Sequence, residues 1–245
     1  MMPTSTRKVV AILQSNYIPW KGYFDLINFA DEFIFYDEVQ YTKNDWRNRN
    51  RIKTPQGPAW LTIPVRQTSL DQRILDTPIS DPKWAVKHWR TLAQTYARAP
   101  YFKQYKDELE AFYNDPGSEL LSAVNRRLIE LICGWLGIGS RLSSSTDYEM
   151  GEGKTERLVR LVQAVGGTHY LSGPSARDYL QTSLFTDVGL SVEWMDYSDY
   201  APYHQAGPAP FEHSVSVLDL LFNEGPAAPR FMKSFAARPA TPTAS

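Results

Sequence analysis

The stretch VVAILQSNYIPWKGYFDLINFADEFIFYDEVQ, residues 9–40, decides the predicted fold. It begins with a short apolar run typical of a buried strand, passes through a polar loop over 14–20, and turns helical over 21–29. A second apolar run over 32–36 predicts another strand, which ends in the acidic pair Asp37-Glu38. This order predicts a βαβ unit of an α/β fold with a mostly parallel, Rossmann-like sheet, where ligands bind at the carboxyl ends of the strands.

The composition is that of a globular protein, with 42% hydrophobic and 22% charged residues among 245. The formal net charge of -1 argues against binding to nucleic acid by bulk electrostatics. We expect one domain over 1–235 and a disordered tail over 236–245. No apolar run approaches the roughly 20 residues of a membrane span, and the N-terminus lacks the apolar core of a secretory signal, so we expect a cytoplasmic protein.

A basic segment from Lys43 to Lys53 follows the opening βαβ unit. Its cations alternate with polar or apolar residues, which in an extended chain places them on one face. The Pro/Gly turn over 54–58 and the extended return that follows predict a β-hairpin arm. We interpret the arm as a clamp for a diphosphate or an RNA backbone, the alternative being a hairpin edge guarded by charge. Its candidate binding residues are Arg47, Asn48, Arg49, Asn50 and Arg51.

Helical periodicity predicts a helical insertion over 81–138. Its clearest helix is expected to be capped by Ser118 and to end at Gly137. The α/β pattern then resumes. The predicted elements are a polar loop over 141–153, a helix over 154–164, a strand over 168–171, a short helix over 176–180, a strand over 190–195 and a closing helix that stops at Gly225.

Three Ser/Gly-containing loops, over 14–20, 143–155 and 172–175, each precede a predicted helix. We expect them to share one edge of the sheet and to form a site for a phosphorylated ligand, because helix N-termini attract anions. Neither the Rossmann glycine fingerprint nor a phosphate-loop motif is present. The candidate binding residues in these loops are Gln14, Asn16, Tyr17, Trp20, Lys21, Lys154, Ser172 and Gly173.

The opening loop is similar to that of the nucleotidyltransferase-type adenylate-forming fold, where a His-x-Gly-His turn leads into the first helix. Here the segment WKGY, residues 20–23, occupies that register, so both histidines are replaced and the usual adenylyl transfer is not expected. The alternative interpretation is a strand-to-helix turn that Trp20 and Tyr23 pack.

Two residues are candidates for proton transfer. Asp37 ends the second predicted strand, and His204 lies in an aromatic loop. The four histidines have no metal-type spacing, so no metal site is predicted, and the residues identify no cofactor. The single Cys133 lies in an apolar helix pattern typical of an inert thiol.

Five segments together resemble the WbqC-like protein family. They are QSNYIPWKGYFDLI, DEFIFYDEVQY, WRNRNRIKTPQG with WLTIPV, THYLSGPSARDYL and FEHSVSVLDLLFNEG. One departure is Ser15, where the family usually has proline after the first glutamine. Members of this family occur in gene clusters for O-antigen and other surface polysaccharides, and attachment of glycine to an amino sugar has been suggested for them.

The resemblance implies an aminoacyl (glycyl) transferase that forms an amide on a nucleotide-linked amino sugar. Its expected partners are that sugar, or another phosphorylated small molecule, and an activated amino-acid donor such as a charged tRNA. Two alternatives are a different nucleotide-dependent amide-forming enzyme and a non-catalytic protein that binds a nucleotide or RNA.

Overall fold

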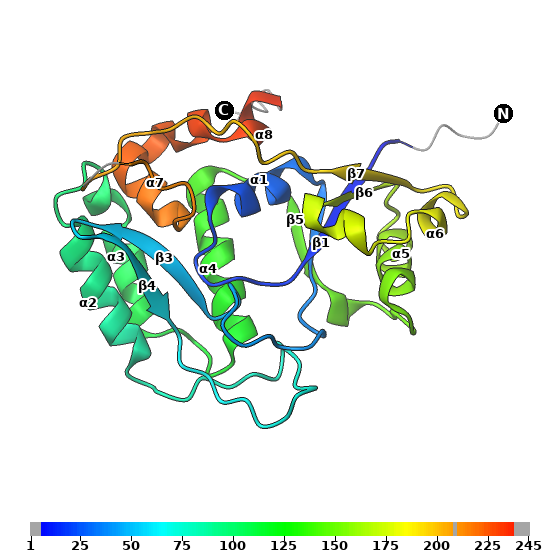
Figure 1. Cartoon of the computed structure of the whole chain (residues 1–245), viewed down its shortest axis with the longest axis horizontal. Coiled ribbons are helices and arrows are strands. Elements are labelled where there is room, and N and C mark those ends of the chain that lie inside the picture. Colours follow the sequence, from blue (N-terminus) through cyan, green and yellow to red (C-terminus); the bar gives the residue numbers. More distant parts are fainter. Residues whose placement is uncertain (1–5, 208–209, 238–245) are drawn as a thin grey trace, which may run out of the picture.

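The computed structural model describes residues 6–207 and 210–237. Its centre is a parallel five-stranded sheet in the order β5-β2-β1-β6-β7 (Figure 1). The strands are β1 (Val9–Leu13), β2 (Glu32–Phe35), β5 (Arg141–Ser144), β6 (His169–Ser172) and β7 (Ser191–Trp194). The predicted α/β fold is therefore confirmed. Because the chain steps outward from β1 through β2 to β5 and then crosses back to β6, the topological switch point lies between β1 and β6.

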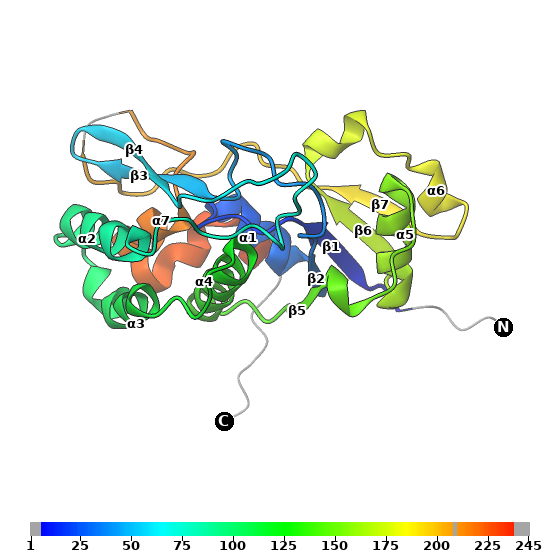
Figure 2. The same ribbon diagram turned by 90° about the horizontal axis from the view of Figure 1, so that it is seen from below.

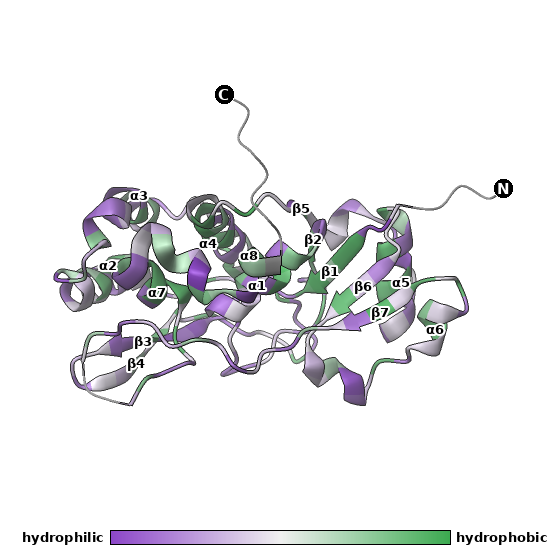
Figure 3. Cartoon of the chain, turned by 90° about the horizontal axis from the view of Figure 1, so that it is seen from above, coloured by the Kyte–Doolittle hydropathy of each residue, from purple (hydrophilic) through white to green (hydrophobic). Residues whose placement is uncertain are grey.

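Alternate side chains of β1 enter two separate cores. Val9 and Ala11 face the larger core, which includes the helices α1 (Lys21–Phe29) and α4 (Leu121–Leu136). Val10 and Ile12 face a smaller core with α5 (Lys154–Ala164) and α6 (Ser183–Thr186). Figure 3 shows β1 among the most hydrophobic segments of the chain. An apolar run without polar alternation therefore produces a strand buried on both faces, as parallel sheets require.

A lobe beside the sheet holds the predicted hairpin, and its β3 and β4 pair antiparallel. Figure 2 shows the hairpin at the end of the molecule opposite α5 and α6. The larger core runs without a break from the sheet into this lobe. The elements of the lobe are β3 (Arg49–Thr54), β4 (Gly57–Thr62), α2 (Trp84–Tyr96), α3 (Phe102–Asn114) and α7 (Val217–Glu224).

Helix α4 ends as predicted, with Gly137 in the left-handed region at φ 70°. Its start differs from the prediction, because it begins at Leu121 without a side-chain cap. The preceding residues are held in an extended pairing, in which Ile79 N–H donates to Glu119 O at 2.8 Å and Leu121 N–H donates to Thr77 O at 2.9 Å. Ser118 accepts only from the backbone N–H of Leu120, so it closes a local turn and not the helix.

Two further elements differ from their prediction. Strand β5 falls in the segment predicted as a polar loop, and the predicted helix over 176–180 is a 3₁₀ turn over Pro174–Asp178. At the C-terminus, residues 236 and 237 of the predicted tail end helix α8 (Lys233–Ala237), and the rest of that tail lies outside the described residues. No helix within 6–207 or 210–237 has both the length and the apolar character needed to cross a bilayer.

Candidate functional site

A cavity of about 600 Å³, which we call the switch-point cavity, opens at the carboxyl ends of β1 and β6. It is the crevice in which sheets of this topology bind their ligands. Gln14 follows β1, Ser172 ends β6, and Lys154 begins α5, and all three line this cavity. Three predicted binding residues from loops far apart in the sequence are thus brought together.

The walls of the switch-point cavity combine positive charge with aromatic rings. Lys154 and Arg157 lie at the N-terminus of α5, where the helix dipole adds partial positive charge. Tyr36, Tyr170 and Tyr179 supply aromatic surface. The arrangement suits an anionic group joined to a planar ring or a sugar.

Glu38 is the acidic residue of this cavity. Its carboxylate atom Oε2 is buried and has no hydrogen-bond partner within the described residues. A buried carboxylate oxygen without a donor is costly, so a ligand, an ion or an ordered water is expected to satisfy it. A cationic or amine ligand would supply the missing donor.

Arg47 binds two side-chain amides at once and forms what we call the Arg47 clamp. Its guanidinium donates to Gln14 Oε1 at 3.2 Å and to Asn16 Oδ1. Because arginine is a donor only, the oxygens of both amides must face it. The amide nitrogens of Gln14 and Asn16 therefore face away, and neither has a partner within the described residues. The clamp therefore fixes the orientation of both amides, so that each presents its N–H groups as donors.

A second cavity of about 280 Å³, the tryptophan pocket, lies next to the clamp, because Asn16 lines it. Asn16, Trp20 and Asn50 line it together with Trp46, Pro19 and Ser214. Six of the predicted site residues therefore line these two cavities, three in each. Gln14 borders the switch-point cavity and Asn16 borders the tryptophan pocket, and Arg47 joins them.

Residues of β3, α2 and α3 hold the opening loop, residues 14–20, in place. Asn50 Nδ2 donates to the carbonyls of Tyr17 and Ile18 at 3.2 and 3.0 Å. Tyr17 is fully buried, and its hydroxyl pairs with His88 Nδ1 and with the hydroxyl of Tyr113. Burial raises the pKa of Tyr17 well above its usual range. Tyr17 therefore anchors the loop through its buried hydroxyl and lines neither of these two cavities.

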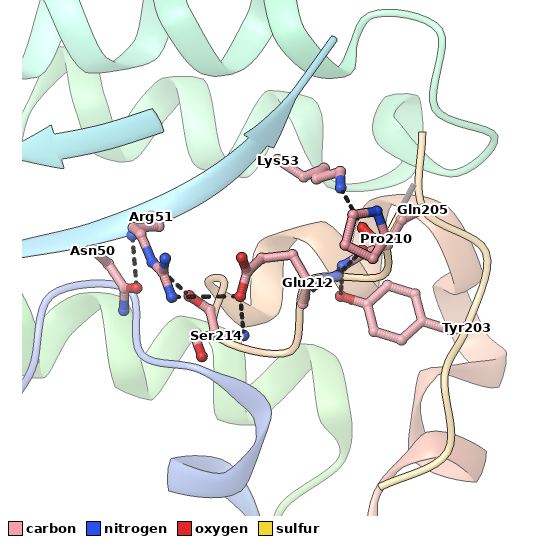
Figure 4. A network of polar contacts seen from close by, with 8 residues as sticks. All are labelled: Asn50, Arg51, Lys53, Tyr203, Gln205, Pro210, Glu212 and Ser214. Atoms are coloured by element: carbon pink, nitrogen blue, oxygen red, sulfur yellow. Dashed lines mark hydrogen bonds and ion pairs between the residues drawn. The ribbon is translucent and has the colours of Figure 1, made fainter. Parts of the chain in front are cut away.

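The remaining arm residues are largely engaged within the protein. Asn48 is buried and donates to Ile63 O at 2.8 Å. The guanidinium of Arg49 lies 4.3 Å from the centre of the Trp60 ring. Arg51 donates to Ser214 O at 3.2 Å and forms an ion pair with Glu212 at 3.4 Å (Figure 4). The Arg51 contacts attach the segment that precedes α7 to the hairpin.

Trp20 and Gly22 explain the turn into α1. A Cβ atom at Gly22 would lie 2.3 Å from the Trp20 ring, so only glycine lets this ring fold over the start of the helix. The ring then packs edge-on against Tyr197 and Tyr200 at 5.1 and 5.7 Å. Trp20 therefore packs the turn, as the alternative interpretation predicts, and it also lines the tryptophan pocket.

Lys21 is 4% exposed and lies 4.7 Å from the centre of the Tyr200 ring, with Nζ donating to Ala201 O at 3.1 Å. Burial lowers its pKa from 10.5 to about 8, and Asp25 opposes this shift. Lys21 lines neither the switch-point cavity nor the tryptophan pocket. We therefore assign it to the contact between α1 and the 200–203 segment.

The lowered pKa of Lys21 predicts a pH-dependent stability. Between about pH 8 and 10.5 the unfolded chain binds more protons at this site than the folded one, so this site makes the free energy of unfolding rise with pH. In Lys21→Met this rise should be missing, and urea denaturation from pH 7 to about 9.5 measures it. The exposed Lys103→Met is the control. Parallel pH curves for wild type and Lys21→Met would contradict the assignment.

Neither residue predicted for proton transfer lines the switch-point cavity. Asp37 is 4% exposed, and its carboxylate already accepts from Ser15 N–H at 2.8 Å and from the Ser122 hydroxyl. His204 is exposed, and its backbone N–H donates to Glu224 at 3.0 Å. Its segment borders the hairpin, at the end of the molecule opposite α5 (Figure 2). Gly173 follows Ser172 and is the N-cap residue of the 3₁₀ turn.

Glu38 and Trp46 line the two cavities but are not among the candidate residues predicted from the sequence. The sequence shows Glu38 as half of the acidic pair Asp37-Glu38, but it does not show which of the two carboxylates reaches the cavity. Trp46 stood beside the basic segment without an assigned role. No group of three or more His, Cys, Asp or Glu side chains in the described ranges is arranged to hold a metal ion.

Comparisons with known proteins agree with the family resemblance. The sequence model of the WbqC-like protein family matches residues 14–231. The chain is 51% identical over 227 residues to the uncharacterized protein Rv1507c of Mycobacterium tuberculosis (strain ATCC 25618 / H37Rv), covering 92% of this chain and 98% of that relative. No solved structure matches the chain.

Proposed function

The chain belongs to the WbqC-like protein family, and we propose that it transfers a glycyl group to the amine of a nucleotide-linked amino sugar used for surface polysaccharide. The observation that carries the proposal is the switch-point cavity, where Gln14, Lys154 and Ser172 meet. Its volume of about 600 Å³ suits a ligand of nucleotide-sugar size. The proposed reaction takes place in the cytoplasm.

Each wall of the cavity has a part in this proposal. The diphosphate would bind at the N-terminus of α5 beside Lys154 and Arg157, where charge and helix dipole act together. Tyr179 is 72% exposed and would cover the base or the sugar. The acceptor amine would lie next to Glu38, whose Oε2 lacks a donor among the described residues.

The chemistry is an amide-forming acyl transfer in which Glu38 replaces Asp37 and His204 as the proton acceptor. The amine nitrogen attacks the carbonyl carbon of an activated glycyl ester, thioester or acyl phosphate, and a C–N bond forms. One amine proton passes to Glu38. The C–O or C–S bond of the donor then breaks, and the leaving group departs with its electron pair. The N–H of Gln14 lies on the same cavity wall and is a candidate to stabilise the developing oxyanion.

The test is incorporation of glycine into UDP-glucosamine, followed by mass spectrometry, with ATP plus glycine, glycyl-tRNA or a glycyl thioester as donor. We expect a product heavier by one glycyl group. If no donor yields it, the substrate assignment fails. Binding of UDP-glucosamine, measured by calorimetry, tests the cavity separately from the chemistry.

Replacement of Lys154 should weaken nucleotide-sugar binding. Loss of a charged hydrogen bond to a phosphate costs about 1.5–3 kcal/mol, so the Kd of UDP-glucosamine should rise roughly 10- to 150-fold in Lys154→Ala. The matched control is Lys103→Ala, an exposed lysine on α3 outside the cavity, which should bind as wild type does. Equal affinities of Lys154→Ala and the control would remove the phosphate from this end of the cavity.

The alternative of a non-catalytic RNA-binding protein depends on three arginines free to reach a phosphate backbone. Arg47 is committed to the clamp and Arg51 to Glu212. We therefore favour the transferase. Salt-sensitive retention of tRNA by the wild-type protein, lost when Arg47, Arg49 and Arg51 become alanine, would reverse this preference if no glycyl donor yields a product.

A further inference from the structure

The tryptophan pocket has the composition of a binding site for a planar group. Trp20, Trp46 and Pro19 form apolar walls, and the amides of Asn16 and Asn50 and the Ser214 side chain provide polar edges. Its volume of about 280 Å³ lies just below the usual range for small-molecule sites, which begins at about 300 Å³. It is therefore too small for a whole nucleotide-sugar and suits a nucleoside.

Asn16 gives this pocket a fixed polar contact. Asn50 cannot do so, because its Nδ2 donates to the opening loop and its Oδ1 accepts the N–H of Arg51 at 2.8 Å. The clamp holds Asn16 Oδ1, so its free Nδ2 offers a donor to a ring nitrogen or a carbonyl oxygen. A ligand in this pocket would thus be both stacked and hydrogen-bonded.

The mouth of the tryptophan pocket continues as an exposed aromatic platform. Trp46 is 41% exposed and lies 5.5 Å from Trp60, which is 47% exposed, with a tilt of 37° between the rings. The guanidinium of Arg49 covers part of the Trp60 ring at 4.3 Å. Two neighbouring exposed tryptophans with an arginine beside them are typical of surfaces on which nucleobases stack next to a phosphate.

We propose that the tryptophan pocket binds the terminal nucleoside of the activated glycyl donor, and that the Arg47 clamp lies between this nucleoside and the acceptor in the switch-point cavity. The inference rests on the proposed function and adds the donor class, an aminoacylated nucleotide. Transfer then takes place across the clamp, where Gln14 faces the acceptor and Asn16 faces the donor. The donor is either a free glycyl adenylate or the 3′ end of a glycyl-tRNA, and the platform favours the tRNA.

The experiment measures two ligands on the same proteins. The donor probes are AMP and a single-stranded RNA tetranucleotide that ends in adenosine, and the acceptor probe is UDP-glucosamine. In Trp46→Ala the Kd of the donor probe should rise roughly 5- to 150-fold, as expected for the loss of one stacking partner, while UDP-glucosamine binding stays unchanged. Trp46→Phe keeps a ring and should recover most of the affinity. Tyr179→Ala should do the reverse and weaken only UDP-glucosamine.

The outcomes separate this inference from the proposed function. If UDP-glucosamine binds and neither donor probe does, or if Trp46→Ala binds the donor probe as wild type does, the donor site is wrong and the acceptor site stands. If the donor probe binds and UDP-glucosamine does not, the acceptor site is wrong. Tighter binding of the RNA than of AMP, lost in Trp60→Ala, identifies the tRNA as the source. Equal binding of both identifies the adenylate.

Discussion

Glu38→Gln should lower the rate of glycyl transfer by roughly 10²- to 10⁴-fold, the usual contribution of a general base, while the KM for the nucleotide-linked amino sugar changes little. The carboxamide keeps the shape of the side chain and its place in the switch-point cavity, but it cannot accept the proton of the attacking amine. Single-turnover rates with UDP-glucosamine and the active glycyl donor measure the effect. An equal loss of binding and rate would instead assign Glu38 to amine recognition.

Two control variants sharpen the Glu38 result. Glu152→Gln removes an exposed carboxylate from the loop that precedes α5 and should leave the rate unchanged. Asp37→Asn alters the neighbouring carboxylate, whose oxygens hold Ser15 and Ser122, so it should lower stability more than it lowers the rate per folded molecule. A near-normal rate in Glu38→Gln together with a collapsed rate in a folded Asp37→Asn would return the proton acceptor to Asp37.

The opening βαβ unit was predictable because its signals are local. Strand β1 is an uninterrupted apolar run, and Gly22 marks the turn into α1. Strand β5 was missed because it is short and polar at the sheet edge. Only Ser143 in it is buried, and its hydroxyl donates to Glu32 at 2.9 Å. Such a strand is specified by its neighbour in the sheet, and no periodicity in its own residues reports this pairing.

The composition of the candidate site was predicted better than its geometry. Loops that follow parallel strands meet at one edge, so the meeting of Gln14, Lys154 and Ser172 follows from topology. The Arg47 clamp does not follow from the sheet topology. Arg47 lies 33 residues from Gln14 in sequence, and its contact with that side chain depends on how the hairpin packs against the opening loop. The alternation of cations along the arm predicted one basic face, whereas in the folded protein each arginine contacts a different set of partners.

Asp25→Ala should produce the largest loss of stability among the variants considered. Asp25 lies on α1 and is fully buried. Its carboxylate accepts from the Tyr200 hydroxyl at 2.5 Å, from the backbone N–H groups of Lys233 and Ser234 at 3.0 and 2.9 Å, and from the Ser234 hydroxyl. One side chain therefore connects three segments distant in sequence. Burial, and after it the proximity of this carboxylate, raises the pKa of Tyr200.

Removing the Asp25 carboxylate leaves buried donors unpaired, so the free energy of unfolding should fall by about 3–5 kcal/mol, as when one partner of a buried charged network is lost. Urea denaturation at pH 7 measures this against the exposed Asp71→Ala, which should stay within about 0.5 kcal/mol of wild type. A loss below about 1 kcal/mol would mean that water or rearrangement satisfies the donors. Because Tyr200 also packs on Trp20, the tryptophan pocket should loosen together with α8, and the donor probe should bind more weakly to Asp25→Ala even where it remains folded.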